Sequence, residues 1–258
     1  MDTLVLKLVV TPVLIFAASL AGRRWGETVS GWFIGLPLTS GPVCFFLALE
    51  QGPGFAGSTA RGSLAGAAAE AGFGVAYVMV AQRAGWPAAL LAGTLGYVAA
   101  AALFPSDLPL WLLGAIVYLA LAAGLALMPR LQAGSAAIPA APRWDIPARM
   151  VVATALVFGL TELAPLFGAR LSGLLATYPL FGAVLAAFAH RLNGAAAAER
   201  VLRGLVIGLF GFTGFFLLLA ATMERLGLAA SFTAATFLAL LIQGGSLALM
   251  RRATSLRR

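Results

Sequence analysis

Hydrophobic residues fill the chain in continuous blocks of about twenty, separated by short stretches that contain charges, glycine or proline. A helix of this length crosses about 30 Å of hydrocarbon. The blocks lack the polar–apolar alternation of an outer-membrane barrel, and isolated strands would leave backbone groups unpaired in lipid. The pattern therefore predicts an all-α, polytopic membrane protein with about nine spans, over roughly residues 3–21, 29–49, 59–82, 86–104, 109–129, 147–166, 170–190, 201–222 and 227–250.

The stretch between the fifth and sixth blocks is rich in alanine and proline, with scattered charges, and reads as a linker. It divides the chain into a first membrane repeat over residues 1–129 (about five helices), a cytoplasmic linker over 130–146, and a second membrane repeat over 147–258 (about four helices).

A shift of 142 residues aligns the chain with itself without a gap. Pairs that match in this register include Pro37 with Pro179, the Arg61-Gly62 dipeptide with Arg203-Gly204, and Gly72-Phe73 with Gly214-Phe215. An offset of five spans, being odd, turns the second unit over in the bilayer. Inverted repeats of this kind are a common plan of secondary transporters, with the substrate near the midplane, although duplicated membrane proteins without transport activity also exist.

Composition supports the membrane reading, because 61% of the residues are hydrophobic, 10% are charged, and the mean hydropathy is +0.97. The net charge of +8 comes from basic residues at the ends of the apolar blocks, so it indicates orientation rather than nucleic-acid binding. With the N-terminus outside and the C-terminus inside, the outside holds only Lys7, Arg61, Arg170 and Arg225, and the other thirteen arginines lie inside. Abundant alanine, arginine and glycine with a single lysine suggests a bacterial inner membrane.

Two spans are interrupted at matching positions. The second contains GLPLTSGP and the seventh contains ATYPLFG. Proline removes a backbone donor and clashes with the preceding turn, and glycine loosens the helix further. Interruptions at corresponding places in two halves are typical of a transporter site, although proline kinks are also ordinary in membrane helices. The predicted substrate-binding residues here are Pro37, Thr39, Ser40, Gly41, Pro42, Tyr178 and Pro179.

Glu70 lies near the middle of the third block. An ionised carboxylate there costs about 2.5–3.5 kcal/mol, so it should face a cavity or a partner. It is predicted to bind substrate or to couple transport to protons, unless it serves as a protonated hydrogen-bonding group between helices. Arg61 and Arg203 begin their spans at matched positions. Each is predicted either to cap or brace the loop that precedes its span, or to act in gating and contact an anion.

No enzyme signature is present in the sequence. It has no nucleotide-binding loop, no HExxH motif, and only one histidine and one cysteine. We therefore expect no enzyme activity, no cofactor and no metal site.

The stretch GARLSGLLATYPLFGAVLAAFAHRLNGAAAAERVLRGLVIGLFGFTGFF, together with its counterpart through GWFIGLPLTSGPVCFFLALEQG, resembles GlpM-type small membrane proteins. The shared pattern is a glycine-initiated, proline-broken helix, then a loop and an arginine-bearing helix. The resemblance covers about a third of the chain, and it implies a fused, duplicated four-span unit. The resemblance implies a fold but no particular biochemical activity. TSGPVCFFLALEQGPGFAGSTARGSLAG is similar, more weakly, to the Pro-Gly-Pro entry of LysE-type exporters, but Gly41-Pro42 here lacks the preceding proline.

The sequence thus favours a transporter or exporter of a small solute, with proton coupling as an option, working by alternating access between the two repeats. Two alternatives stay open: a non-transporting partner or assembly subunit of a membrane complex, and a flippase for a lipid or lipid carrier. The expected partners are the lipid bilayer and a small or lipid-like substrate, no nucleic acid is expected, and a homo-oligomer is compatible with the sequence.

Overall fold

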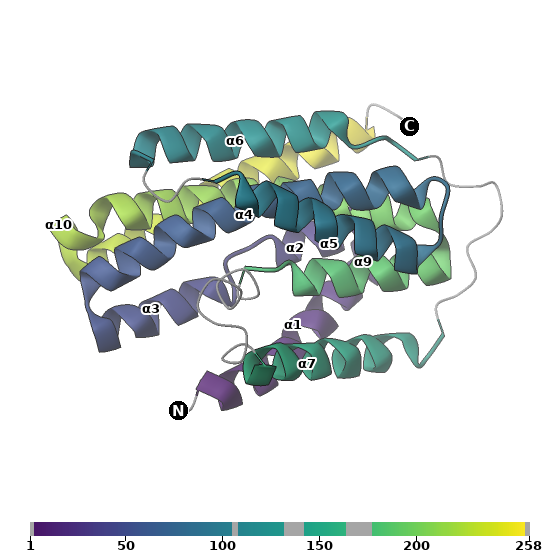
Figure 1. The fold of residues 1–258 in the computed structure, drawn as a ribbon, viewed down its shortest axis with the longest axis horizontal. Helices are drawn as coiled ribbons and strands as arrows, with labels where there is room; N and C mark the ends of the chain where they lie inside the picture. Colours follow the sequence, from purple (N-terminus) through teal and green to yellow (C-terminus); the bar gives the residue numbers. More distant parts are fainter. Residues whose placement is uncertain (1–2, 105–107, 132–141, 164–176, 256–258) are drawn as a thin grey trace.

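The computed structural model describes residues 3–104, 108–131, 142–163 and 177–255, and every regular element in these ranges is a helix. The helices, labelled in Figure 1, are α1 (Thr3–Trp25), α2 (Glu27–Ile34), α3 (Ser40–Gln51), α4 (Pro53–Ala81), α5 (Trp86–Ala102), α6 (Leu110–Leu127), α7 (Asp145–Leu163), α9 (Leu180–Asn193) and α10 (Ala195–Ser255).

The element α10 consists of two helical legs that meet at Gly227, whose φ of 74° and ψ of 178° leave the helical region. The Gln243 side chain on the second leg donates to the Gly208 carbonyl on the first, at 2.7 Å. Six residues further along the first leg, Gly214 lies against Ile242, which comes before Gln243 on the second leg. The two legs therefore lie side by side and antiparallel.

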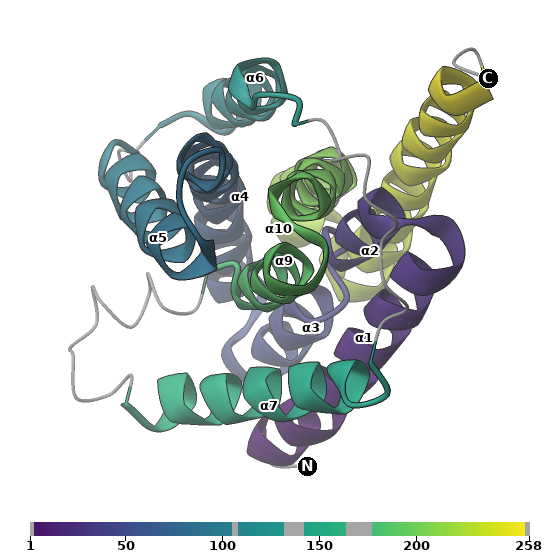
Figure 2. The same ribbon diagram turned by 90° about the vertical axis from the view of Figure 1, so that its right-hand side faces the viewer.

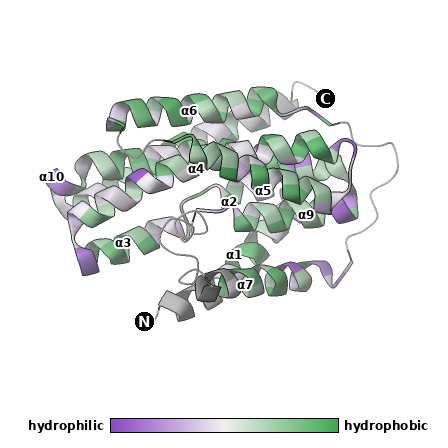
Figure 3. Cartoon of the chain, in the orientation of Figure 1, coloured by the Kyte–Doolittle hydropathy of each residue, from purple (hydrophilic) through white to green (hydrophobic). Residues whose placement is uncertain are grey.

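Three helices are long and apolar enough to cross a membrane: α4, α6, and α10 over Ala195–Leu249. Large hydrophobic side chains also cover the outside of the molecule, where Trp111, Leu119 and Phe237 are 65–73% exposed. Figure 3 shows hydrophobic residues along the helices and hydrophilic residues mainly toward the ends of the molecule. Length, composition and this outward-facing apolar surface together indicate association with a membrane.

The centre of the molecule is formed by α4 and the first leg of α10, which pack against each other and against α2, α6 and α9 (Figure 2). The outer pair α1 and α7 lies on one side of this centre. Buried aromatic side chains, including Phe73, Tyr77 and Phe216, fill the core between these helices.

Small residues bring α2 very close to the first leg of α10. A Cβ added at Gly31 would lie 1.8 Å from the Val201 carbonyl oxygen, and one added at Gly204 would lie 2.0 Å from the Thr28 carbonyl oxygen. Helices in lipid associate through such close backbone packing, because lipid tails supply no hydrophobic driving force between them.

The predicted interruption of the second span is present. The helix α2 ends at Ile34 and α3 begins at Ser40. Pro37 lies in the gap, and Pro42 is the third residue of α3, where a backbone N–H would have no partner within the helix. Thr39 precedes α3 and makes no side-chain capping hydrogen bond. Proline chemistry thus accounts for both the end of α2 and the new start at α3.

The described part of the predicted seventh span begins with the turn residues Thr177 and Tyr178. Pro179 then precedes the first residue of α9, and the Ala183 amide donates to the Pro179 carbonyl at 2.8 Å. Residues 170–176 of that predicted span, including Arg170, and most of the linker lie outside the described residues.

Two helices begin earlier than their polarity suggests. The helix α4 begins at Pro53, six residues before the predicted span, because Ser58 and Thr59 donate to the carbonyls four residues back, at 3.2 and 3.0 Å. Such back-bonding satisfies a hydroxyl within a helix. The element α10 begins at Ala195, six residues early, and an ion pair between Glu199 and Arg203 lies within its first turns.

Candidate functional site

A cavity of about 1090 Å³ lies where the interrupted segments approach α4 and the C-terminal end of α5. Six of the eight predicted substrate-binding residues line it: Thr39, Ser40, Pro42, Glu70, Tyr178 and Pro179. Residues of α1, α7 and the first leg of α10 complete the lining. Segments from both halves of the sequence therefore meet around one space.

Glu70 projects from the middle of α4 and is the one carboxylic acid among the described residues of the lining. No arginine or lysine lines the described wall. Within the described parts of the chain, Glu70 forms no hydrogen bond or ion pair, and Tyr97 lines the same cavity. A carboxyl group placed in this way is available to bind a proton or a ligand.

Two tyrosines connect the turn before α9 to α5. The Tyr97 hydroxyl lies 2.5 Å from the Thr177 hydroxyl, and the Tyr178 hydroxyl lies 2.9 Å from that of Thr94. Thr94 donates its own proton to the Leu90 carbonyl, so Tyr178 is the donor in its pair with Thr94. These bonds fix the position of the second interrupted segment.

The rings of these tyrosines form one wall of the cavity. Tyr97 and Tyr178 pack edge to face with centroids 5.5 Å apart, and Phe73 packs against Tyr178 in the same way at 5.9 Å. Edge-to-face contacts of this kind stabilise a specific ring orientation. The site therefore has an ordered aromatic surface beside its carboxyl group.

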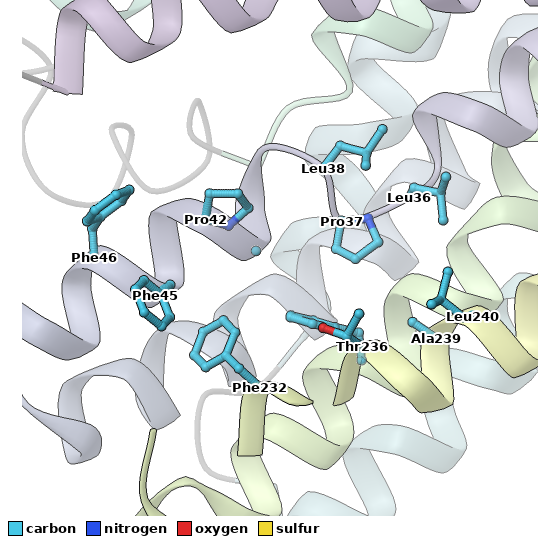
Figure 4. A pocket seen from close by; sticks show the side chains of 12 residues that line it. Leu36, Pro37, Leu38, Pro42, Phe45, Phe46, Phe232, Thr236, Ala239 and Leu240 are labelled. Carbon is cyan, nitrogen blue, oxygen red and sulfur yellow. The ribbon is translucent and has the colours of Figure 1, made fainter. Parts of the chain in front are cut away.

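The other two predicted residues, Pro37 and Gly41, line a second pocket of about 440 Å³. Figure 4 shows Pro37 and Pro42 in the interrupted segment, with Phe232 and Thr236 of the second leg of α10 opposite. Leu36, Leu38 and Pro42 line both spaces. The segment between α2 and α3 is thus a thin wall that separates the cavity from an apolar pocket.

Neither predicted arginine lines the described wall of the cavity. Arg61 donates to the carbonyl of Leu108, just before α6. Arg203 donates to the carbonyls of Leu125 and Met128, at the other end of α6, at 3.0 and 2.8 Å. These three carbonyls lie in or beside α6 and do not belong to the loops that precede the spans of Arg61 and Arg203. Bracing of the preceding loops, and anion contact or gating by the arginines, therefore stay predictions.

Sequence reasoning missed Thr94, Tyr97 and Thr177. Thr94 and Tyr97 are three residues apart and so share one face of α5, which is a signal that the sequence contains. Thr177 carries no such signal, because its role depends on the tertiary contact with Tyr97.

The described residues contain no cluster of three or more His, Cys, Asp or Glu side chains able to hold a metal ion. Among the described lining residues, the polar side chains are one carboxylic acid and several hydroxyls, a set that suits reversible binding of a proton or a ligand.

No protein-family profile, no curated protein and no solved structure matches the chain. The resemblance to GlpM-type proteins therefore stays a prediction from its motif.

Proposed function

We propose that this protein is a membrane transporter of a small solute, built from two inverted-topology repeats that alternate access to the cavity around Glu70. The observation that carries the proposal is the cavity itself, because both proline-interrupted segments and the intramembrane carboxyl group line it. Interrupted helices and ionisable groups inside a membrane are costly, and they mark substrate and ion pathways.

Matching local structure at a spacing of 142 residues supports the repeat. Gly52 alone separates α3 from α4, and Gly194 alone separates α9 from α10. Their φ and ψ values are 87° and 170° for Gly52 and 83° and 173° for Gly194.

Reciprocal contacts give independent support for a two-fold relation. A Cβ added at Gly35 would lie 2.7 Å from the Cα of Gly208, and one added at Gly66 would lie 2.8 Å from the Cβ of Thr177. Thr177 is the repeat mate of Gly35, and Gly208 is the mate of Gly66. In a two-fold arrangement, a contact between Gly35 and the mate of Gly66 requires an equivalent contact between Gly66 and the mate of Gly35.

On this reading α2 and α3 form one interrupted span and the two legs of α10 form two spans. The chain then crosses the membrane about nine times, and α6 is the helix that joins the repeats. In the mechanism, one repeat rocks against the other about Pro37–Pro42 and Tyr178–Pro179, and Glu70 binds the substrate or the coupling proton.

Accessibility from the two sides of the membrane tests this function without knowledge of the substrate. Thr39 lines the cavity and its side chain caps no helix, so Thr39→Cys in a Cys44→Ala background supplies one reporter thiol. In oriented vesicles, an alternating-access transporter exposes this thiol to a membrane-impermeant reagent from either side. Labelling from one side only, or from neither, favours a non-transporting partner and contradicts the proposal.

The control is Glu50→Cys in the same background. Glu50 is exposed near the end of α3 and does not line the cavity. It should react from one side only, which shows that the reagent does not leak across the membrane.

The lipid-flippase alternative has one observation in its favour, the apolar pocket beside Pro37. That pocket lies next to α3 and the second leg of α10, and neither Arg61 nor Arg203 lines it. A flippase would move a fluorescent lipid between the leaflets of vesicles that contain the purified protein, and a solute transporter would not.

A further inference from the structure

The geometry points to a lipophilic organic cation as the substrate, bound as an ion pair with Glu70 against the aromatic wall of the cavity. This inference rests on the proposed transport function and names the class of substrate that the same site would take.

Charge is the first reason. Glu70 is the one charged side chain among the described residues of the wall, and Arg61 and Arg203 donate to carbonyls in and beside α6. An anionic solute would find no counter-charge there and would lie close to a carboxyl group. Because unpaired charges in a low-dielectric site are costly, the described wall selects against anions and for cations.

The hydrogen bonding within the aromatic wall is the second reason. The hydroxyls of Tyr97 and Tyr178 are hydrogen-bonded to Thr177 and Thr94, so this wall favours an apolar group over a highly hydroxylated solute such as a sugar. The rest of the described wall is largely apolar, with Phe104, Phe181 and Phe212 among its large side chains. Such a wall stabilises hydrophobic groups, and the aromatic faces attract a cation.

Size and access are the third reason. A volume of about 1090 Å³ far exceeds that of an inorganic ion and suits a drug-sized organic molecule. On the other side of the segment between α2 and α3, the apolar pocket is lined by Phe46 and Leu240, which are 45% and 61% exposed on the outer surface. A lipophilic cation dissolved in the bilayer would thus be separated from Glu70 only by residues Leu36–Pro42.

Binding would exchange the cation for a proton. When the carboxyl group of Glu70 is protonated it is neutral and holds no counter-charge, so binding of the cation releases one proton, and protonation releases the cation. The other titratable groups among the described residues of the lining are Tyr97 of α5 and Tyr178 ahead of α9. The described lining contributed by α1, α3, α7 and α10 contains no titratable side chain. Because a proton and the cation compete for one group, affinity for the cation should rise with pH.

Two ions of similar size and shape but opposite charge test the inference on the purified full-length protein: tetraphenylphosphonium and tetraphenylborate. We expect tetraphenylphosphonium to bind and tetraphenylborate not to bind. Glu70→Gln should weaken tetraphenylphosphonium binding at least about tenfold, equal to about 1.4 kcal/mol, and remove its pH dependence. Glu70→Asp should retain part of both. Glu50→Gln, which alters an exposed acid outside the cavity, should match the unsubstituted protein.

The inference is wrong if tetraphenylborate binds as well as tetraphenylphosphonium, or if Glu70→Gln binds tetraphenylphosphonium with unchanged affinity. A thermal unfolding curve for each variant separates loss of binding from loss of fold. If Thr39→Cys is labelled from both sides but tetraphenylphosphonium does not bind, transport stands and the substrate class is wrong. If labelling occurs from one side only, the proposed function itself is wrong.

Discussion

Arg61 and Arg203, which lie 142 residues apart, donate hydrogen bonds at the two ends of one helix. Arg61 donates to a carbonyl ahead of α6, and Arg203 donates to the carbonyls of Leu125 and Met128 at its end. Arg203 also pairs with Glu199 at 2.5 Å. The last carbonyls of a helix accept no hydrogen bond from within the helix. The several N–H groups of a guanidinium supply donors for them, which lipid cannot supply.

Replacement of Arg203 should therefore destabilise the protein. We expect Arg203→Ala to lower the free energy of unfolding by about 1.5–3 kcal/mol, the range for hydrogen bonds to a charged group, because it leaves two carbonyls and Glu199 unpaired. Arg61→Ala should cost less, because Arg61 bonds to one carbonyl. Thermal unfolding in detergent measures both. The control is Arg225→Ala, which alters an exposed arginine and should leave stability unchanged. A variant at Arg203 that keeps full stability but loses anion binding would favour the anion-contact role instead.

At the scale of single residues, the sequence was informative where a residue conflicts with lipid. Glu70 and the prolines stand out because a charge or a broken helix is costly in an apolar block, and most of these residues line the cavity. Tyr97 did not stand out, because a lone tyrosine in a membrane helix is ordinary. Only the fold shows that its hydroxyl meets Thr177, 80 residues later.

At the scale of elements, every predicted apolar block contains helix where the chain is described, but α4 and α10 begin earlier than the blocks predict. The sequence predicts loops for the polar residues just before the spans 59–82 and 201–222. In the structure these residues form the first turns of α4 and α10. Bonds four residues back along the helix satisfy Ser58, Thr59 and Arg203. Hydropathy measures transfer of a side chain from water, so it cannot register polar groups whose partners lie one turn away.

A single glycine forms the tight corner between α3 and α4, and another forms the corner between α9 and α10. Gly52 and Gly194 combine a positive φ with a ψ near 170°, a region that side chains other than glycine rarely enter. We expect Gly194→Ala and Gly52→Ala each to reduce the free energy of unfolding by about 1–3 kcal/mol. Thermal unfolding supplies the measurement.

Gly57→Ala is the matched control for this prediction. Gly57 lies inside α4, and an added Cβ would meet nothing within 4 Å. Alanine favours a helix interior over glycine by about 1 kcal/mol, so this variant should be neutral or slightly more stable. Equal losses at Gly57 and Gly194 would show that backbone conformation is not the cause.

At the scale of the whole molecule, the proposed inverted repeat predicts how the two halves are oriented. Residues at matching positions would have similar local structure but lie on opposite sides of the membrane. Gln82 follows α4, and its mate Glu224 lies 142 residues later, just before the corner at Gly227. Both side chains are exposed. They form a matched pair for a test of orientation.

We expect Gln82→Cys and Glu224→Cys, each in a Cys44→Ala background, to react with an impermeant thiol reagent from opposite sides of the membrane. Gln82 adjoins Arg83, so the excess of basic residues inside predicts labelling from the cytoplasm, and Glu224 should be labelled from outside. Intact cells compared with inside-out vesicles make the measurement, and detergent-solubilised protein shows that both thiols react when unrestricted. Labelling of both from one side would mean that the two units lie parallel. The reciprocal contacts of Gly35 with Gly208 and of Gly66 with Thr177 would then need another cause, and rocking of one repeat against its inverted mate would no longer describe how the cavity opens.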